Sequence, residues 1–270
     1  MLYLLPTPIG NLSDVSFHSL EILKICEIIL CEDTRVSKKL LNLLENRFEL
    51  NFADKEFVSV HSHNEEKITT EISDILRDKI CVYMSDAGMP CISDPGVYLV
   101  RHAQNLGIAY EVISGSNATL LAAAASGIVK KEFVFLSFLP NTGKERTKAI
   151  ENALNLAYPA IIYESPKRIL SLIEAIRDLD ENRQIFLIKE ATKKFEKKFW
   201  GKVKDVANAL KDENLSGEWS VVIDKNPANS QEKISLDDIN NLDIPPKQKA
   251  KLIAKITGDS VKDIYNILTK

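Results

Sequence analysis

Tyr83-Met84-Ser85-Asp86-Ala87-Gly88-Met89-Pro90-Cys91-Ile92-Ser93-Asp94-Pro95-Gly96 is the stretch that decides the fold, because small, acidic and proline residues abruptly replace an apolar run there. Residues 80–84 are typical of a short strand buried in a parallel sheet. Asp94-Pro95 predicts a helix N-cap followed by proline at the first helical position. The residues between them form a loop at the carboxyl end of a strand, where open α/β sheets bind small ligands. An ordinary strand-to-helix connection is the alternative interpretation.

Composition indicates a globular protein of α/β size. The chain has 270 residues, of which 45% are hydrophobic and 27% charged. No apolar run approaches the length of a membrane span, and the N-terminus does not resemble a signal peptide, so we expect a cytoplasmic protein. The four cysteines lack CxxC spacing, which favours free thiols over a metal site or disulfides. The net charge of −3 argues against indiscriminate coating of nucleic acid but allows local basic patches.

Strand-like and helical patterns alternate through the first half of the chain, which predicts a mostly parallel sheet with helices on both faces. A loop follows each predicted strand, and parallel strands bring such loops to one edge, where they share a cleft. These loops contain few lysines or arginines, and neither a GxGxxG nor a Walker A motif occurs. A neutral or weakly charged ligand held by backbone groups is therefore expected. The five strands are expected at 2–5, 27–31, 57–60, 80–84 and 110–113, and the loops at 6–14, 32–35, 61–64, 85–90 and 114–118.

The second half predicts another α/β domain and a helical tail. Polar residues Asn141 to Lys148 are expected to link the two domains, and Ser165-Pro166 to begin a helix. The tail predicts three short helices in a helix-turn-helix-like arrangement, with Ser260 and Asp263 spaced as a capping box. The fold class is thus two α/β domains with mostly parallel or mixed sheets and a small helical subdomain. The predicted boundaries are 1–115 for the first domain, 116–225 for the second, 226–234 for a linker and 235–270 for the helical subdomain.

Seven segments together resemble the tetrapyrrole methylase superfamily, and within it the branch that methylates small-subunit ribosomal RNA. They are LPTPIGNLSD at 5–14, EDTR at 32–35, HSHN at 61–64, SDAGMP at 85–90, DPG at 94–96, FLP at 138–140 and YESPKR at 163–168. The similarity runs in order from about residue 2 to 224. The resemblance implies S-adenosylmethionine as cofactor, bound between two α/β domains, and a homodimer. It implies methylation of the ribose 2′-hydroxyl of a cytidine in the decoding region of 16S rRNA. The partner would be small-subunit rRNA or the assembled small ribosomal subunit.

Matching the family motifs position by position implies a cofactor site. Its residues would be Pro8, Gly10, Ser85, Asp86, Ala87, Gly88, Ser116, Asn117, Ala118 and Leu139. Three positions depart from the family pattern, which has threonine where Met89 stands and proline where Ser114 and Ser116 stand. Hydroxyl groups at 114 and 116 could supply an alternative contact or a helix cap.

Five residues could act as a general base or orienting group: Glu32, Asp33, His61, His63 and Glu190. The structural alternative is that Asp33 pairs with Arg35 or caps the next helix, and that the histidines hold a loop. Positive charge for RNA is expected from Arg35, Lys144, Arg146, Lys148, Lys167, Arg168, Lys193, Lys194, Lys197 and Lys198. Phe195 and Phe199 stand among the last four and could stack on bases, although a charge run is more often a solvated face.

Two other functions remain open at this point. The chain could be a tetrapyrrole methylase-type enzyme that acts on a small tetrapyrrole or a protein side chain, or it could be a non-catalytic RNA-binding module. The basic clusters and the lysine-rich tail from Lys247 onward weigh against the first. A non-catalytic RNA-binding module would not explain the cleft that the loops share.

Overall fold

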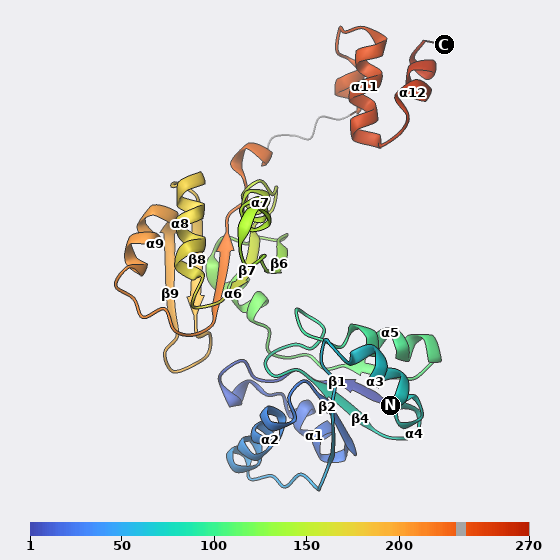
Figure 1. Ribbon diagram of the computed structural model, residues 1–270, viewed down its shortest axis with the longest axis vertical. Helices are drawn as coiled ribbons and strands as arrows, with labels where there is room; N and C mark the ends of the chain where they lie inside the picture. The colour runs from blue at the N-terminus through green and yellow to red at the C-terminus, as the bar shows by residue number, and fades with distance from the viewer. Residues whose placement is uncertain (231–235, 270) are drawn as a thin grey trace. The chain divides into compact units, whose positions relative to one another are not determined.

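The computed structural model describes residues 1–230 and 236–269. Contacts within the chain divide it into two units, Met1–Lys225 and Asn226–Lys270. The larger unit contains two five-stranded sheets, and the smaller one is helical (Figure 1).

The first sheet is entirely parallel, with strand order β3-β2-β4-β1-β5. This confirms the parallel sheet predicted for the first half of the chain. Its strands are β1 (Leu2–Leu4), β2 (Ile28–Cys31), β3 (Glu56–Ser59), β4 (Cys81–Met84) and β5 (Tyr110–Val112). The connecting helices are η1 (Leu12–Asp14), α1 (Phe17–Ile25), α2 (Thr34–Phe48), α3 (Glu65–Glu71), α4 (Ser73–Asp78) and α5 (Val97–Leu106).

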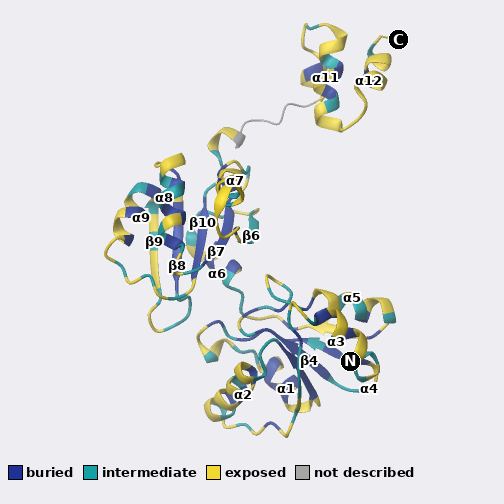
Figure 2. Ribbon diagram, viewed as in Figure 1, coloured by how far each residue is buried: buried dark blue, intermediate teal, exposed yellow. Residues whose placement is uncertain are grey.

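Both faces of this sheet are covered, because successive side chains of a strand point to opposite faces. In β2, Ile29 and Cys31 belong to the core under α1 and α2, whereas Ile28 and Leu30 belong to the core under α4 and α5. All four residues are fully buried. Figure 2 shows the buried strands between helices whose outer faces are exposed. The apolar strand runs seen in the sequence are therefore explained by burial on two sides.

Helix α5 begins later than the sequence predicts, so the assignment of Asp94 as its N-cap is wrong. The cap position is Gly96, and the capping acceptor is the buried carboxylate of Glu65 on α3. Glu65 Oε1 accepts the N–H groups of Gly96 and Tyr98, each at 2.8 Å. In many helices a side chain at the N-cap accepts the first free N–H groups. In α5 a carboxylate on another helix accepts them instead.

The second sheet is mixed, with strand order β6-β7-β10-β8-β9. β6 and β7 are parallel, while β10 runs antiparallel to both of its neighbours. The strands are β6 (Val134–Phe138), β7 (Ala160–Glu164), β8 (Gln184–Lys189), β9 (Lys197–Lys202) and β10 (Trp219–Ile223). The helices are α6 (Ala118–Ser126), α7 (Gly143–Leu154), α8 (Ile169–Leu179) and α9 (Val203–Leu210).

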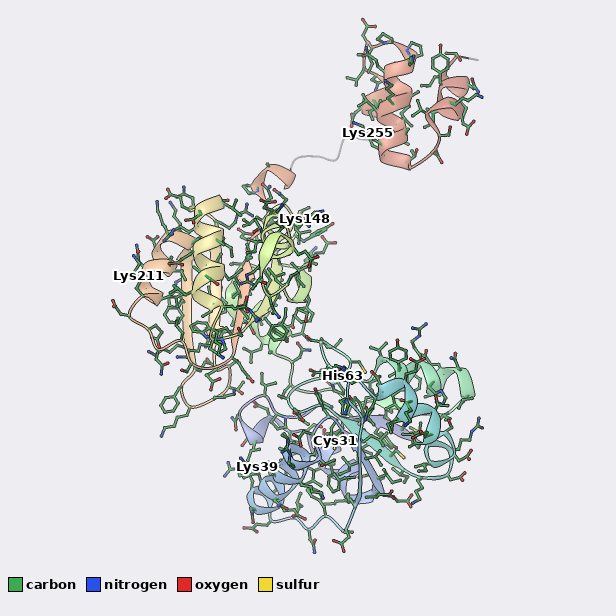
Figure 3. All side chains as sticks on the ribbon, viewed as in Figure 1. Cys31, Lys39, His63, Lys148, Lys211 and Lys255 are labelled. Carbon is green, nitrogen blue, oxygen red and sulfur yellow. The ribbon has the colours of Figure 1, made fainter. Side chains whose placement is uncertain are left out.

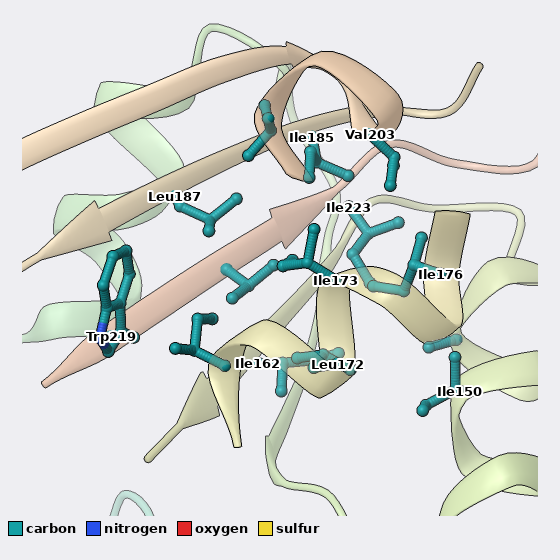
Figure 4. Packing of buried hydrophobic residues seen from close by; sticks show 14 of the residues in the cluster. Ile150, Ile162, Leu172, Ile173, Ile176, Ile185, Leu187, Val203, Trp219 and Ile223 are labelled. Carbon is teal, nitrogen blue, oxygen red and sulfur yellow. The ribbon is translucent and has the colours of Figure 1, made fainter. Parts of the chain in front are cut away.

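Helices α7, α8 and α9 cover one face of the second sheet. Ile150 of α7, Ile173 of α8 and Val203 of α9 pack against Ile162 and Leu187 of the sheet in one buried cluster (Figure 4). The opposite face is covered by α6 through Ala122 and Ala123. The strands of the second sheet are therefore buried between helices, like those of the first.

Two sequence predictions for the second sheet are wrong. Residues 143–148 of the expected linker are the first half of α7, whose far end is anchored in the core by Ala153 and Leu154. Helix α8 starts at Ile169, because Ser165 forms a turn in which its carbonyl accepts the N–H groups of Arg168 and Ile169. Packing against the sheet explains the first difference, and a local turn explains the second.

The smaller unit has a core of its own. Ile239, Ala250, Ile253 and Ile264 are its buried residues. Its elements are η2 (Pro227–Ser230), α10 (Leu236–Asn240), α11 (Pro246–Thr257) and α12 (Val261–Leu268), and Ser260 caps α12 by accepting the Lys262 N–H at 3.3 Å. Residues 231–234 of the expected linker lie outside the described residues. The strands of the two sheets fall within 1–115 and 116–225, and the domain boundaries stay a prediction.

Replacing Glu65 with alanine should lower the free energy of unfolding by about 1–3 kcal/mol, because the buried N–H groups at the start of α5 lose their acceptor. Urea unfolding followed by circular dichroism measures the effect. Glu66→Ala is the matched control, since Glu66 is its exposed neighbour on α3. Equal losses in both variants would show that Glu65 does not cap α5.

Candidate functional site

A cavity of about 460 Å³ lies within the larger unit, where strand ends of both sheets meet. This volume is in the range of small-molecule sites. The first sheet contributes Ile9, Glu32, Asp86, Ala87, Gly88, Met89, Ile92, Ser93 and Asp94. Asn117, Ala118, Phe138, Tyr163, Glu164, Ser165, Pro166, Ile188, Ala191, Glu218, Trp219 and Ser220 complete the lining.

A larger hollow of about 620 Å³ lies over α3 and includes His63 and Tyr98. It is lined mostly by exposed polar and charged side chains of one helix and the turn before it. No strand ends other than that of β3 converge on it. The smaller cavity is therefore the better candidate for a functional site, since it combines apolar walls with converging polar groups.

A backbone bridge joins the loops that follow β1 and β4. The Thr7 N–H donates to the Gly88 carbonyl at 2.9 Å, and the Gly88 N–H donates to the Thr7 carbonyl at 3.1 Å. The Thr7 hydroxyl also donates to the Ser85 carbonyl at 3.3 Å. Gly88 has φ +89°, and a Cβ there would lie 3.3 Å from Ile9 Cγ2. Glycine is thus needed for the bend that keeps the cavity wall free of side chains.

The antiparallel direction of β10 brings its first residues to the edge where β7 and β8 end. Trp219 and Ser220 of β10 therefore line the cavity beside Tyr163 of β7 and Ile188 of β8. The Tyr163 hydroxyl is 2.7 Å from the Thr119 hydroxyl, which fixes the phenol ring against α6.

Gly10 lies where the loop after β1 meets the loop after β8. Its ideal Cβ would lie only 2.5 Å from Lys193 Cγ and 2.6 Å from the Thr192 hydroxyl oxygen. Beside it, the Asn11 N–H donates to the Thr192 hydroxyl at 3.1 Å. The loop after β1 thus approaches the loop after β8 closely, and a side chain at residue 10 would separate them.

Five carboxyl groups line the cavity, and those of Glu164 and Glu218 are paired with arginine or lysine. The other three belong to Glu32, Asp86 and Asp94. Burial raises the pKa of each of these three groups, and a neighbouring negative charge raises it further. The charge of Asp86 acts on Glu32 and Asp94, and that of Asp33 acts on Asp86. The Asp33 N–H, which donates to Asp86 Oδ1 at 3.2 Å, offsets part of this for Asp86. Crowded, partly desolvated carboxylates favour a positively charged ligand, because a nearby cation stabilises their ionised form.

Comparison with known proteins decides the family. Residues 1–207 match the model of the tetrapyrrole (corrin/porphyrin) methylases. The chain is 59% identical to ribosomal RNA small subunit methyltransferase I of Campylobacter fetus, and the match covers all of both chains. The chain belongs to the tetrapyrrole methylase family. It is 41% identical to the enzyme of the same name from Helicobacter pylori, over 98% of this chain and 96% of that one.

A solved tetrapyrrole methylase has the same fold. The uroporphyrin-III C-methyltransferase of Thermus thermophilus, in complex with S-adenyl homocysteine, matches with a TM-score of 0.55 and 16% identity over 82% of this chain and 96% of that one. The predicted superfamily, fold class and methyltransferase activity are confirmed. The cofactor is S-adenosylmethionine.

The residues that line the cavity fit this cofactor. The carboxylates of Glu32, Asp86 and Asp94 match the positive charges of a sulfonium and an ammonium group. Ile9 and Ala118 supply apolar surface of the kind that an adenine ring needs. Gly88 keeps this wall free of side chains, while its own N–H and carbonyl groups are bonded to Thr7.

Half of the predicted cofactor residues line the cavity: Asp86, Ala87, Gly88, Asn117 and Ala118. Ser85 is buried behind Gly88, whose carbonyl its hydroxyl contacts at 3.4 Å. Leu139 lies in the core of the second sheet. Pro8, Gly10 and Ser116 lie beside the lining residues without being among them, and Ser116 O is 3.8 Å from the position of a Gly88 Cβ. Met89 lines the cavity, so a thioether stands where the family pattern has a hydroxyl.

Glu32 is the one catalytic candidate among the residues that line the cavity. Asp33 caps α2 and pairs with Arg35 at 2.6 Å, and the hydrogen bond from Arg35 lowers its pKa to about 2. His61 and His63 lie in the turn after β3, where the His63 N–H donates to His61 Nδ1 at 3.3 Å. For Asp33 and the histidines, these contacts agree with the structural alternative.

Glu190 organises a loop. Its Oε1 accepts the Glu218 N–H and the Lys193 ammonium, each at 2.9 Å. Burial raises the pKa of Glu190, but these hydrogen bonds outweigh it and bring the pKa below its ordinary value. A carboxylate with two strong donors is poorly suited to accept a proton.

Most of the predicted RNA-binding cations are engaged in ion pairs. The buried Glu164 accepts Arg146 at 2.7 Å and Arg168 at 2.8 Å. Arg35, Lys193, Lys197 and Lys198 pair with Asp33, Glu190, Glu213 and Glu196, in that order. Within the part of the chain that the structure describes, Lys144, Lys148, Lys167 and Lys194 are the predicted cations without a carboxylate partner, and Lys148 extends from α7 (Figure 3).

Sequence reasoning missed most of the wall that the second sheet provides. Tyr163 to Pro166 and Phe138 lie in the quoted family motifs, which was a usable signal. Glu218, Trp219 and Ser220 line the cavity because β10 is antiparallel, and strand direction cannot be read from an apolar run. Among the described residues, no group of three or more His, Cys, Asp or Glu could hold a metal ion, and all four cysteines are free.

Gly88→Val should abolish detectable S-adenosylmethionine binding in calorimetry, because a branched side chain at φ +89° strains the backbone and intrudes between Ile9 and the cavity. Gly107→Val is the control. Gly107 also has a positive φ, +64°, but no heavy atom lies within 4 Å of its Cβ position. Unchanged affinity in Gly88→Val would remove this loop from the cofactor site, and equal losses would indicate a general effect of strain.

Proposed function

We propose that the protein transfers a methyl group from S-adenosylmethionine to the ribose 2′-hydroxyl of a cytidine in the decoding region of 16S rRNA. The family assignment and the full-length similarity to enzymes named ribosomal RNA small subunit methyltransferase I support this activity. The observation that carries it is a cavity whose carboxylates and glycine-lined wall suit a cationic cofactor.

The bound cofactor supplies an electrophilic methyl group on a positively charged sulfur. The backbone from Asp86 to Met89 would hold it on one side, with Asn117 and Ala118 on the other. Methyl transfer to oxygen is an in-line displacement, so alignment by these walls contributes roughly 7–11 kcal/mol. A general base contributes about 3–5 kcal/mol. Positioning is therefore the larger demand on the protein.

We infer that Glu32 is the group that accepts the proton of the ribose hydroxyl. It lines the cavity, and burial together with the charges of Asp86, Asp94 and Asp33 raises its pKa above the ordinary value of 4.5. A carboxylate with a raised pKa is a stronger base than an exposed one. The other four candidates would then have structural roles in a helix cap, a turn and a loop: Asp33, His61, His63 and Glu190.

The RNA would be held by the cations that the structure leaves without carboxylate partners, Lys144, Lys148, Lys167 and Lys194 within the described chain. Lys194 also lies over the Phe195 ring, 5.6 Å from its centroid. Arg146 and Arg168 are fixed by Glu164 and would set the position of the strand end rather than reach for phosphates. The smaller unit, with lysines on α11, would add a second RNA contact.

The proposed partner is small-subunit rRNA or the assembled small subunit, and the proposed assembly is a homodimer in the cytoplasm. Among the described residues, the helices are all too short or too polar to cross a membrane.

The function is tested by incubating the protein and labelled S-adenosylmethionine with small subunits that lack this modification. We expect label on the 2′-oxygen of one cytidine in the decoding region, located by nuclease digestion and mass spectrometry. Label on a base, label on protein, or no label would contradict the proposal.

Glu32→Gln should lower the rate of methyl transfer by about 10²- to 10⁴-fold while the cofactor still binds. The wild-type rate should fall as the pH drops through the pKa that Glu32 has in the cofactor-bound enzyme, because the protonated carboxyl cannot accept a proton. The variant should lose this dependence. Single-turnover rates measured across a range of pH give both the loss of rate and the pH dependence. Glu21→Gln is the control, because Glu21 is an exposed residue of α1. A variant that keeps the wild-type rate would exclude Glu32 as the base.

Deleting residues 231–270 should weaken methylation of small subunits and preserve S-adenosylmethionine binding, because the smaller unit has its own core and the candidate cofactor cavity is lined by the larger unit alone. Calorimetry and the methylation assay together measure the two effects. Equal loss of both activities would instead make this segment a structural part of the enzyme.

A further inference from the structure

Two large apolar side chains of the cavity lining remain exposed. Phe138, at the end of β6, is 55% exposed, and Ile92, in the loop after β4, is 44% exposed. They come from different sheets of the same unit. Exposed apolar side chains at the rim of a cavity indicate a ligand surface more often than isolated ones elsewhere do.

A bulge in β6 directs Phe138 toward the cavity. Phe135 pairs with Ile161, but the next pairing joins Phe138, rather than residue 137, to Tyr163. One extra residue is therefore inserted, and it returns Phe138 to the face that Phe135 occupies. In a regular strand, Phe138 would point to the opposite face, on which Leu139 and α7 pack.

The backbone on both sides of the cavity is strained to achieve this. Ser137 has φ +55°, while Cys91 and Ser93, on either side of Ile92, have φ +70° and +72°. Such conformations are costly for residues other than glycine and are held in place by surrounding structure. Here the Ser93 and Ser137 hydroxyls hydrogen-bond to each other and so link the loop after β4 to β6. Each serine immediately follows or precedes one of the two apolar side chains.

The Phe138 ring is supported from behind. It meets the Tyr163 ring edge to face at 5.7 Å between centroids, and Tyr163 meets Phe135 in the same way at 4.9 Å. The Tyr163 hydroxyl is fixed by Thr119. Phe138 is thus a positioned aromatic surface with more than half of its area uncovered.

We propose that Phe138 and Ile92 form the two sides of a subsite for a nucleobase of the RNA substrate, stacked on Phe138 next to the reacting ribose. Bases stack on aromatic side chains in single-stranded nucleic acids. Lys144, an exposed cation without a carboxylate partner in the described residues, begins the helix that follows β6 and could hold the adjoining phosphate. This subsite rests on the proposed function.

The rim position favours a base of the RNA over the adenine of the cofactor. The Gly88 wall and the carboxylates suit the cofactor, whereas Phe138 and Ile92 are the exposed apolar members of the lining. A macromolecular substrate must enter from solvent and would cover such side chains. The hydrogen bond between Ser93 and Ser137 positions Ile92 and Phe138.

The test compares Phe138→Ala, Phe138→Trp and Ile92→Ala in two binding measurements and one kinetic one. These are calorimetry with S-adenosylmethionine, binding of fluorescently labelled small subunits without cofactor, and the dependence of the methylation rate on subunit concentration. Phe138→Ala should weaken subunit binding and raise KM on the order of 10- to 100-fold. S-adenosylmethionine affinity should stay within twofold, Phe138→Trp should restore subunit binding, and Ile92→Ala should show a smaller loss.

Phe17→Ala is the control, because Phe17 is an aromatic side chain 85% exposed at the start of α1. Loss of S-adenosylmethionine affinity in Phe138→Ala would assign the ring to the cofactor and overturn the subsite. Unchanged subunit binding and KM in an active enzyme would overturn the subsite alone. A wild-type protein that leaves the subunits unmethylated would overturn the proposed function, and the subsite with it.

Discussion

The two backbone hydrogen bonds between Thr7 and Gly88 determine how the first sheet presents its loops. β1 and β4 are parallel neighbours, and beyond the sheet the loops that leave them meet again in an antiparallel bridge between Thr7 and Gly88. This pairing fixes Ser85 to Met89 as a wall and requires the positive φ of Gly88. Gly10, in the loop after β1, approaches Thr192 and Lys193 closely, which places this loop against the second sheet. The cavity walls from both sheets depend on these contacts.

A constraint of charge accompanies this geometry. Strand ends bring Glu32, Asp86 and Asp94 into one partly desolvated space, where burial and repulsion raise the pKa of all three. This arrangement is unfavourable in the absence of a cation and becomes favourable with one. The same feature underlies both the proposed binding of a sulfonium cofactor in this cavity and the proposed role of Glu32 as the base.

The sequence was most informative where local pattern and tertiary structure agree. The parallel strands and the loops at their carboxyl ends could be predicted, because burial on two faces leaves continuous apolar runs. The cap of α5 could not, since Glu65 reaches it from another helix. α7 resembled a linker because its first turns are polar, and its apolar anchor lies farther along at Ile150 to Leu154. The edge strand β9 was not recognised, because its lysines were interpreted together with Lys193 and Lys194 as a basic cluster. The errors at α5 and α7 concern contacts between residues that are far apart in the sequence.

If S-adenosylmethionine binds in the carboxylate-lined cavity, its positive charge should interact with the carboxylates there. Calorimetric titration of S-adenosylmethionine and of S-adenosylhomocysteine, the neutral thioether, from mildly acidic to neutral pH in two buffers of different ionisation enthalpy tests this interaction directly. A cation lowers the pKa of neighbouring carboxyls, so we predict that the sulfonium compound binds more tightly as pH rises and releases protons on binding. The thioether should show a weaker pH dependence. Equal pH dependence and equal proton release for both compounds would contradict the account.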